Sequence, residues 1–278
     1  MGGSSSYGTA LEFACLFRKL TEPKRDEILR FCARDPVERV FLEDVARRGL
    51  GRFVARYADG EPREIRALCH IGINVVPSGV GCGEFAREAA KSAPRMFIGE
   101  ERAVSELWEA ARTTLPRPRE DRPGQPVFSI ARTPAAGGTG LRAAEIDDLE
   151  LLIPACASAH ELELGVDPLR RDAEGFRWRT RSQIEEGRSW LWVEDGVILF
   201  KAEASAWTAD AVQLQQVWVD PAARRHGYGA RGLSDLCRLL LARVPTVCLF
   251  VRADHIPAIR LYEAIGMEHV LDYRSILL

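Results

Sequence analysis

The chain is poor in lysine, has no paired cysteine motif and contains no long apolar run. Only four of its 38 basic residues are lysine, and no stretch approaches the roughly 20 apolar residues of a membrane-spanning helix. The formal net charge of −2 predicts no general attraction to nucleic acid or to an anionic membrane. We therefore expect a cytoplasmic protein that binds neither nucleic acid nor membrane. A homodimer is possible.

The seven cysteines form no C-x-x-C pair, and their number is odd. Most lie among apolar neighbours, which is typical of small core residues in a reducing compartment. The run His160-Glu161 begins a zinc-protease motif, but Leu164 stands where the second histidine belongs, so we expect no metal site. The cysteines are Cys15, Cys32, Cys69, Cys82, Cys156, Cys237 and Cys248.

A connector rich in proline and glycine divides the 278 residues into two parts. It runs over residues 114–140, and within it residues 126–130 have the composition of a short strand. A boundary near 132–138 follows, so we expect one domain over 1–132 and another over 139–278. The connector holds Pro116, Pro118, Pro123, Pro126 and Pro134, then Gly137, Gly138 and Gly140.

The C-terminal part alternates helical and strand patterns. Apolar spacing predicts a helix over 145–159, and the Asp167-Pro168 cap begins a second helix that runs to about 186. A Glu194-Asp-Gly turn between two apolar runs predicts a hairpin. The order is that of a mixed α/β fold with an antiparallel start and a βαβ end. The remaining predicted elements are strands over 189–193, 197–206, 212–219, 246–251 and 268–277 and helices over 233–243 and 257–265.

The N-terminal part repeats this order in weaker form. A helical stretch from Leu42 leads into a strand over 52–57, followed by an Ala58-Asp-Gly turn and a strand over 65–76 that ends at Pro77. A helix over 84–90, a strand over 95–98 and a helix over 101–112 follow. We infer a degenerate copy of the same fold in tandem; the alternative is that two α/β segments look alike by chance.

The sharpest motif lies between residues 217 and 230. A strand ends at Asp220-Pro221, a loop with two glycines follows, and a helix begins near Ala230. Such a loop presents backbone N–H groups and a helix N-terminus to an anion. Gly227 and Gly229 let the backbone approach a diphosphate without a Cβ clash. Arg224 and Arg225 add charges that pair with phosphate oxygens.

This loop resembles the diphosphate loop of the GNAT superfamily of N-acetyltransferases, [Q/R]-x-x-G-x-[G/A]. Arg224, Gly227 and Gly229 match its defining positions. About 35 residues later, residues 256–267 look like the family's N-x-x-A-x-x-x-Y-x-x-x-G-F segment through Ala258, Tyr262 and Gly266, while His255 stands where asparagine is usual. The whole chain is similar to a bacterial two-domain subfamily with an N-terminal domain of unknown function. The resemblance implies the mixed-sheet GNAT fold, here as two GNAT-like domains with the N-terminal one degenerate.

The resemblance also implies acetyl-CoA as co-substrate and assigns the residues that hold it. The strand before the loop would bind the pantetheine arm through its backbone, and Tyr262 would be the general acid for the thiolate. The implied coenzyme-binding set is Val217, Trp218, Val219, Arg224, Arg225, His226, Gly227, Tyr228, Gly229, Ala230 and His255.

The sequence does not identify the general base of the reaction. Many GNAT enzymes carry glutamate on the strand before the loop, where this chain has Gln213, Gln215 and Gln216. A neutral amide cannot accept a proton. Glu203, on the preceding strand, is the candidate catalytic substitute; alternatively it is a charge partner of Lys201 or an edge carboxylate.

Two functions fit these motifs. One is an N-acyltransferase that moves an acetyl group from acetyl-CoA to an amine of a small molecule, peptide or protein. The other is a non-catalytic acyl-CoA sensor or regulatory module. A Rossmann-type dinucleotide site is disfavoured, because G-x-G-x-x-G after an early strand is missing. The N-terminal part lacks the arginine-led loop, so we expect no coenzyme there. The acceptor amine is not identified by any motif.

Overall fold

The computed structural model describes residues 20–58 and 64–278. The first half of the chain forms two helices, three strands, a helical turn with a helix, a strand, a helix and a last strand. These are α1 (Arg25–Cys32), α2 (Val40–Arg47), β1 (Arg52–Tyr57), β2 (Ile65–Ile71), β3 (Asn74–Gly79), η1 (Cys82–Phe85), α3 (Ala86–Lys91), β4 (Met96–Glu100), α4 (Glu101–Ala111), η2 (Arg112–Thr114) and β5 (Glu120–Ile130).

The second half runs through the same order after one short extra strand. Its elements are β6 (Arg142–Ala143), η3 (Ile146–Asp148), α5 (Leu149–Leu164), α6 (Pro168–Glu185), β7 (Ser189–Glu194), β8 (Val197–Trp207), β9 (Ala211–Val219), η4 (Pro221–Ala223), α7 (Tyr228–Leu241), β10 (Thr246–Phe250), α8 (Ile256–Ala264) and β11 (Glu268–Leu277). This shared order supports the tandem-copy interpretation, which stays an inference.

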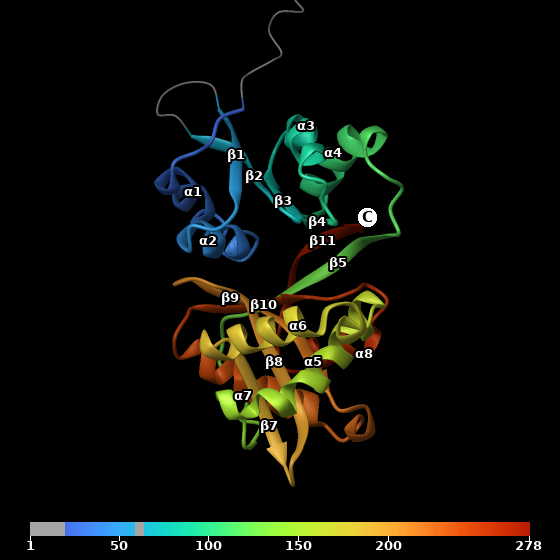
Figure 1. Ribbon diagram of the computed structural model, residues 1–278. Coiled ribbons are helices and arrows are strands. Elements are labelled where there is room, and N and C mark those ends of the chain that lie inside the picture. Colours follow the sequence, from blue (N-terminus) through green and yellow to red (C-terminus); the bar gives the residue numbers. More distant parts are fainter. Residues whose placement is uncertain (1–19, 59–63) are drawn as a thin grey trace, which may run out of the picture.

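The strands of the described residues form one continuous mixed sheet of eleven, in the order β1-β2-β3-β4-β11-β5-β10-β9-β8-β7-β6. The mixed α/β class predicted from the sequence is therefore confirmed. Figure 1 shows the two lobes, one above the other, with β5 and β11 running between them. β11, the last strand of the second half, pairs with β4 of the first half; β5, the last strand of the first half, pairs with β10 of the second. The two halves thus exchange their last strands.

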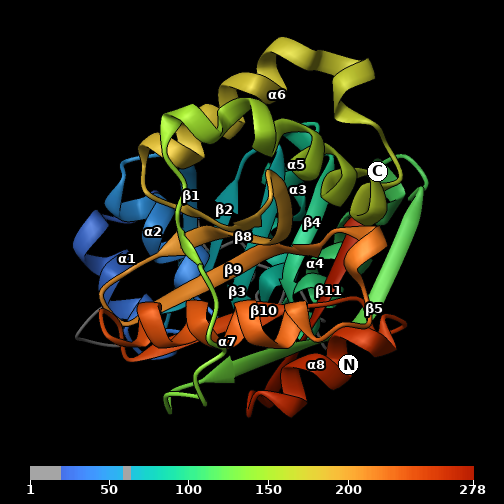
Figure 2. The same ribbon diagram turned by 90° about the horizontal axis from the view of Figure 1, so that it is seen from below.

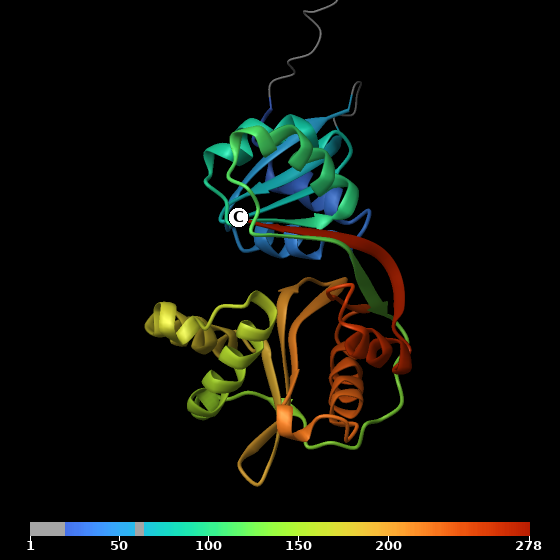
Figure 3. The same cartoon turned by 90° about the vertical axis from the view of Figure 1, so that its right-hand side faces the viewer.

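Helices cover both faces of the C-terminal part of the sheet. Figures 2 and 3 show α5 and α6 on one face and α7 and α8 on the other. The Asp167 carboxylate caps α6 by accepting a hydrogen bond from the Leu169 N–H, as the sequence predicts. On the α7 face, Phe200, Leu233 and Leu240 lie in an apolar core with no exposed surface. α7 begins at Tyr228, two residues before the predicted start, because Gly227 at φ +81° supplies its N-cap.

One predicted strand is wrong. The apolar run over 65–76 is not a single strand ending at Pro77 but two antiparallel strands, β2 and β3, and Pro77 lies within β3 opposite Cys69. The chain reverses at Gly72 and Ile73. Because neither residue is charged or polar, the turn was not predicted from the hydrophobic pattern. The Ala58-Asp-Gly turn falls largely outside the described residues.

The described cysteines are all free and buried, as core residues are. In the part of the chain that the structure describes, no helix combines the length and the apolar character that crossing a membrane requires. The domain boundary near 132–138 stays a prediction. β5 comes before this boundary in the chain, yet in the sheet it lies between β10 and β11, which come after it.

Candidate functional site

The strands β9 and β10 are paired over only three residues each. The parallel ladder joins residues 211–213 to residues 246–248. Beyond it β9 stays with β8 and β10 stays with β5, so a gap opens beside residues 214–219. Gln216, at φ +49°, lies where the register between β8 and β9 shifts, and such a bulge bends a strand. Within the described chain the β10-facing edge of this stretch has no ladder partner, so an extended ligand can pair with it.

The predicted strand residues Val217, Trp218 and Val219 form the open end of β9. Trp218 is buried and its indole N–H donates to the Ser158 hydroxyl, at 3.3 Å, on the α5 face. Val219 pairs with Phe200 on the β8 side. Their backbones lie at the gap, where the sequence-based assignment places the pantetheine arm; that assignment stays a prediction.

The loop after β9 leaves a row of backbone N–H groups free. Asp220 caps the turn η4 by accepting from the Ala222 N–H at 2.7 Å. From residue 225 to residue 230, no N–H donates to a protein acceptor among the described residues. Gly227 begins α7 without a side-chain cap. Gly229 has no room for a Cβ, which would lie 2.7 Å from a methyl carbon of Leu261. The arrangement can bind an anion through these N–H groups.

The positive and polar side chains of the loop are exposed. Arg224 donates from Nε to the Val219 carbonyl at 3.3 Å, and Arg225 forms no ion pair with another described residue. His226 and His255 are also exposed, and His255 precedes α8. The Tyr228 ring packs edge-on against Trp192, at 5.2 Å between centroids, so its phenyl body is structural.

Tyr262 lies on α8 with its ring in the apolar core beside Phe128, 5.7 Å away between centroids. Burial, and then the negative charge of Glu163, raise the pKa of the Tyr262 phenol above its ordinary value. The phenol is therefore protonated at neutral pH, which a proton donor requires. Gly266, at φ +91°, ends the segment after α8 as the family pattern expects.

Glu203 lies on β8 within a buried polar cluster. Its carboxylate accepts a hydrogen bond from the Lys201 ammonium at 2.7 Å and from the Cys156 thiol at 3.2 Å. Burial by itself lowers the pKa of Lys201, but Glu203 and Cys156 outweigh it and the pKa is raised. Burial raises the pKa of the Cys156 thiol to about 12. The charge-partner alternative thus has direct geometric support, and the role of Glu203 as base stays a prediction.

One carboxylate beside this region was not among the predicted site residues. Glu163, in the last turn of α5, is open to solvent, yet the protein atoms crowded around it raise its pKa. The sequence analysis did not select Glu163, because it lies within the incomplete zinc-protease motif that begins at His160 and belongs to no other recognised motif.

The corresponding loop of the N-terminal lobe is filled by the protein itself. Between β3 and η1, the N–H groups of Gly81 and Cys82 donate to one carboxylate oxygen of Glu106, at 2.8 and 2.9 Å. Arg56 lies against the same loop, since a Cβ on Gly81 would be 2.1 Å from its guanidinium. An internal carboxylate thus takes the N–H groups that an anionic ligand would need.

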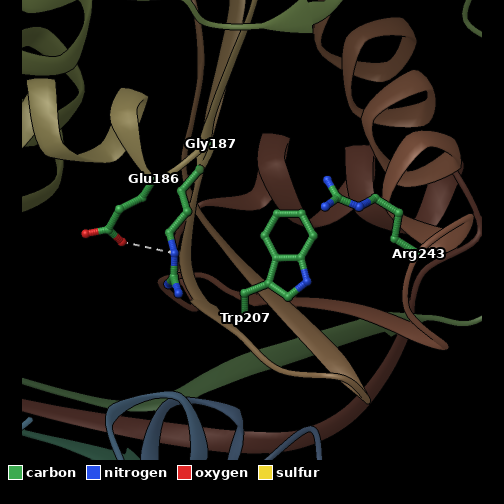
Figure 4. Close-up of a pocket in the computed structure, with 5 residues that line it drawn as sticks. Glu186, Gly187, Trp207 and Arg243 are labelled. Carbon is green, nitrogen blue, oxygen red and sulfur yellow. Dashed lines mark ion pairs between the residues drawn. The ribbon is translucent and has the colours of Figure 1, made fainter. Parts of the chain in front are cut away.

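A separate hollow of about 260 Å³ lies away from the gap. Figure 4 shows Trp207 between Glu186 and Arg243. Glu186 is ion-paired with Arg188, at 3.3 Å. The Arg243 guanidinium stacks on the indole, 4.6 Å from its centroid. Trp207 pairs with Val212 at the start of β9, so this hollow is at the opposite end of that strand from the glycine loop. We assign it no ligand.

Comparison with known proteins agrees with this geometry. Residues 156–267 match the model of the Acetyltransferase (GNAT) family. The chain carries a GNAT acetyltransferase domain. Residues 55–152 match a domain of unknown function, DUF4081. The recognition made from the loop and the tyrosine segment is therefore confirmed. No curated protein matches the chain.

Several solved structures resemble nearly the whole chain in fold. A GCN5-related N-acetyltransferase from Sphaerobacter thermophilus aligns with a TM-score of 0.59 at 19% identity, over 93% of this chain and 94% of its own. An acetyltransferase of the GNAT family from Colwellia psychrerythraea gives 0.57 at 9% identity, over 94% and 100%. A Drosophila protein gives 0.61 at 13% identity, over 93% and 98%. At these identities the likeness shows the fold alone.

Proposed function

We propose that this GNAT protein transfers an acetyl group from acetyl-CoA to an amine of a small molecule, peptide or protein. The observation that carries the proposal is that the gap between β9 and β10 opens beside the free N–H groups of residues 225–230. A pantetheine arm pairs with the free edge of β9 while the diphosphate accepts from the loop. Both parts of the coenzyme then meet backbone groups that lack partners in the described chain.

The transfer itself needs a nucleophile and a proton for the leaving group. The acceptor nitrogen attacks the thioester carbonyl carbon; the N–C bond forms and the C–S bond breaks. The departing thiolate takes the proton of the Tyr262 phenol, whose raised pKa keeps it protonated until then. The residue that takes the proton from the amine is a separate question, because Glu203 is already paired with Lys201.

Coenzyme binding is tested by a matched pair of substitutions at Gly227. Gly227→Asn and Gly227→Asp are similar in size and both tolerate the left-handed backbone, but only aspartate aims a negative charge at the diphosphate. We expect Gly227→Asp to weaken acetyl-CoA binding at least about tenfold more than Gly227→Asn, by calorimetry. Adding Arg224→Ala removes a cation and costs a further factor of about ten, since a charged hydrogen bond contributes about 1.5–3 kcal/mol.

Arg87→Ala is the control for the arginine, because Arg87 is exposed on α3 beside the filled N-terminal loop. We expect it to leave the affinity unchanged. Equal affinities for the aspartate and asparagine variants would contradict the assignment of the diphosphate to this loop.

A non-catalytic acyl-CoA sensor is the second candidate. The observation that favours it is the Lys201–Glu203 pair, which leaves no free carboxylate on β8 or β9 facing the gap among the described residues. Release of free thiol from acetyl-CoA in the presence of a panel of amines separates the two: a sensor binds acetyl-CoA without releasing thiol.

A further inference from the structure

Acetyl transfer to a protonated amine requires a group that accepts a proton, and β9 supplies none. The uncharged polar side chains of β9 are Gln213, Gln215 and Gln216, and an amide cannot accept a proton. Glu203 is buried and held by the Lys201 ammonium at 2.7 Å. A usable base must therefore come from an element outside these strands.

The helix α5 crosses the sheet over the gap. Its middle lies on β8 and β9, where Cys156 contacts Lys201 and Ser158 contacts Trp218. Its end lies on β5, because the Arg122 guanidinium donates to the Glu163 carbonyl at 2.9 Å. In the sheet, β10 and the gap lie between β9 and β5. The helix therefore passes the opening on its way from β9 to β5. It does so on the face opposite α7 and α8, as Figure 3 shows.

The Glu163 side chain in the last turn of α5 is uncommitted. Its carboxylate forms no hydrogen bond or ion pair with any residue in the described ranges, and it is open to solvent. It lies close enough to Tyr262 on α8 to raise the pKa of the phenol. The other charges that face it are Arg122 on β5 and the Lys201–Glu203 pair on β8. Acid, gap and free carboxylate thus meet in one region.

We propose that Glu163 binds the acceptor ammonium and takes its proton, an inference that rests on the proposed acetyl transfer. The ammonium gives one proton to the Glu163 carboxylate, the free nitrogen pair forms the N–C bond, and the C–S bond breaks. The thiolate takes the Tyr262 proton, and the second proton that the nitrogen loses passes through water to the Tyr262 phenolate, which restores the phenol. Glu163, open to water, returns its proton to solvent before the next turnover.

The environment of Glu163 also indicates the class of amine. Crowding by protein raises the pKa of its carboxyl, although Arg122 and then Lys201 oppose this and Glu203 adds to it. A carboxylate of raised pKa is a better base than an ordinary one, but it remains far weaker than a lysine amine of pKa about 10.4. It matches an α-amine of pKa about 7.8 more closely than a lysine side chain, so α-amines are the first probes for the test.

The experiment compares the full-length wild type with Glu163→Gln and Glu161→Gln. Glu161 is exposed on the same turn of α5 and loses the same charge, but it does not act on Tyr262. Acetyl-CoA binding is measured by calorimetry, and thiol release is followed with amino-acid amides as α-amine probes between pH 5 and pH 9. We expect Glu163→Gln to bind acetyl-CoA like the wild type and to lower kcat/KM about 100-fold at pH 7.

The pH profile distinguishes a base from a structural residue. The wild-type rate falls on the acid side as Glu163 is protonated, whereas the Glu163→Gln rate should follow the titration of the amine alone. A Glu163→Gln rate and profile equal to those of the wild type would overturn the inference, as would an equal loss in Glu161→Gln. If the wild type itself binds no acetyl-CoA or releases no thiol, the acetyl-transfer function fails and the inference with it.

Discussion

At the scale of single residues, the role proposed for Tyr262 needs its hydroxyl only in the transition state. Negative charge develops on sulfur only as the C–S bond breaks, so the phenol stabilises that charge and not the bound coenzyme. Its ring packs on Phe128 independently of the hydroxyl. The chemical role and the packing role of this side chain are thus separable.

Tyr262→Phe should lower kcat at least about tenfold and leave acetyl-CoA affinity within about twofold. The ring and its contact with Phe128 remain, so the unfolding midpoint should not move by much. Thiol-release kinetics and calorimetry on the same preparation give both numbers. A variant that turns over at the wild-type rate would show that sulfur takes its proton from water or from another side chain.

At the scale of elements, the two glycine loops have the same place in the chain order of their lobes. They differ in whether their backbone N–H groups have a protein acceptor. In the C-terminal lobe, residues 225–230 leave their N–H groups free. In the N-terminal lobe, the Glu106 carboxylate of α4 accepts from Gly81 and Cys82 and takes the position of an anion. The second loop keeps the geometry of an anion site but satisfies it internally.

We expect the protein to bind one acetyl-CoA per chain. Glu106→Ala should keep that stoichiometry, because Arg56 still covers Gly81, and should destabilise the fold by about 1–3 kcal/mol through two lost hydrogen bonds to a charged acceptor. Calorimetry reports the stoichiometry and urea unfolding the stability. Two coenzymes bound per wild-type chain would show that the N-terminal lobe is a working site.

At the scale of the whole molecule, the lobes are joined by exchanged strands and by a ring of charges. Arg188, before β7, donates two hydrogen bonds to Asp44 of α2, at 2.8 and 3.0 Å, and both side chains are almost wholly buried. Glu186 and Arg48 close the ring, at 2.9 Å from each other. The hydrogen bond to Asp44 raises the pKa of Arg188, so the guanidinium stays charged.

Arg188→Ala should destabilise the protein by about 3–5 kcal/mol, because it leaves Asp44 buried and without its main partner. Arg48→Ala is the control: its side chain is 38% exposed, so its loss should cost about 0–1 kcal/mol. Urea unfolding followed by tryptophan fluorescence measures both. Equal costs for the two variants would mean that the buried pair does not hold the lobes together.

Local pattern alone was enough to predict most elements and the glycine loop between β9 and α7. Helix caps such as Asp167, the Glu194-Asp-Gly turn and the spacing from Arg224 to Gly229 involve neighbouring residues, and their physics acts over a few residues. The hairpin at Gly72 and Ile73 was missed although Gly72 and Asn74 are turn residues, because apolar residues on both sides of them resemble one continuous strand.

The sequence by itself determined the order of most elements, the resemblance to the family and the position of the glycine loop. Only the tertiary structure decided the partners of that site: β5 and β11 lie side by side although Gln125 and Ser275 are 150 residues apart. The same holds for Cys156 with Glu203, for Glu106 in the N-terminal loop and for Glu163 with Arg122. Strand pairing and the crossing of a helix over a sheet depend on contacts between distant segments, and no local spacing records them.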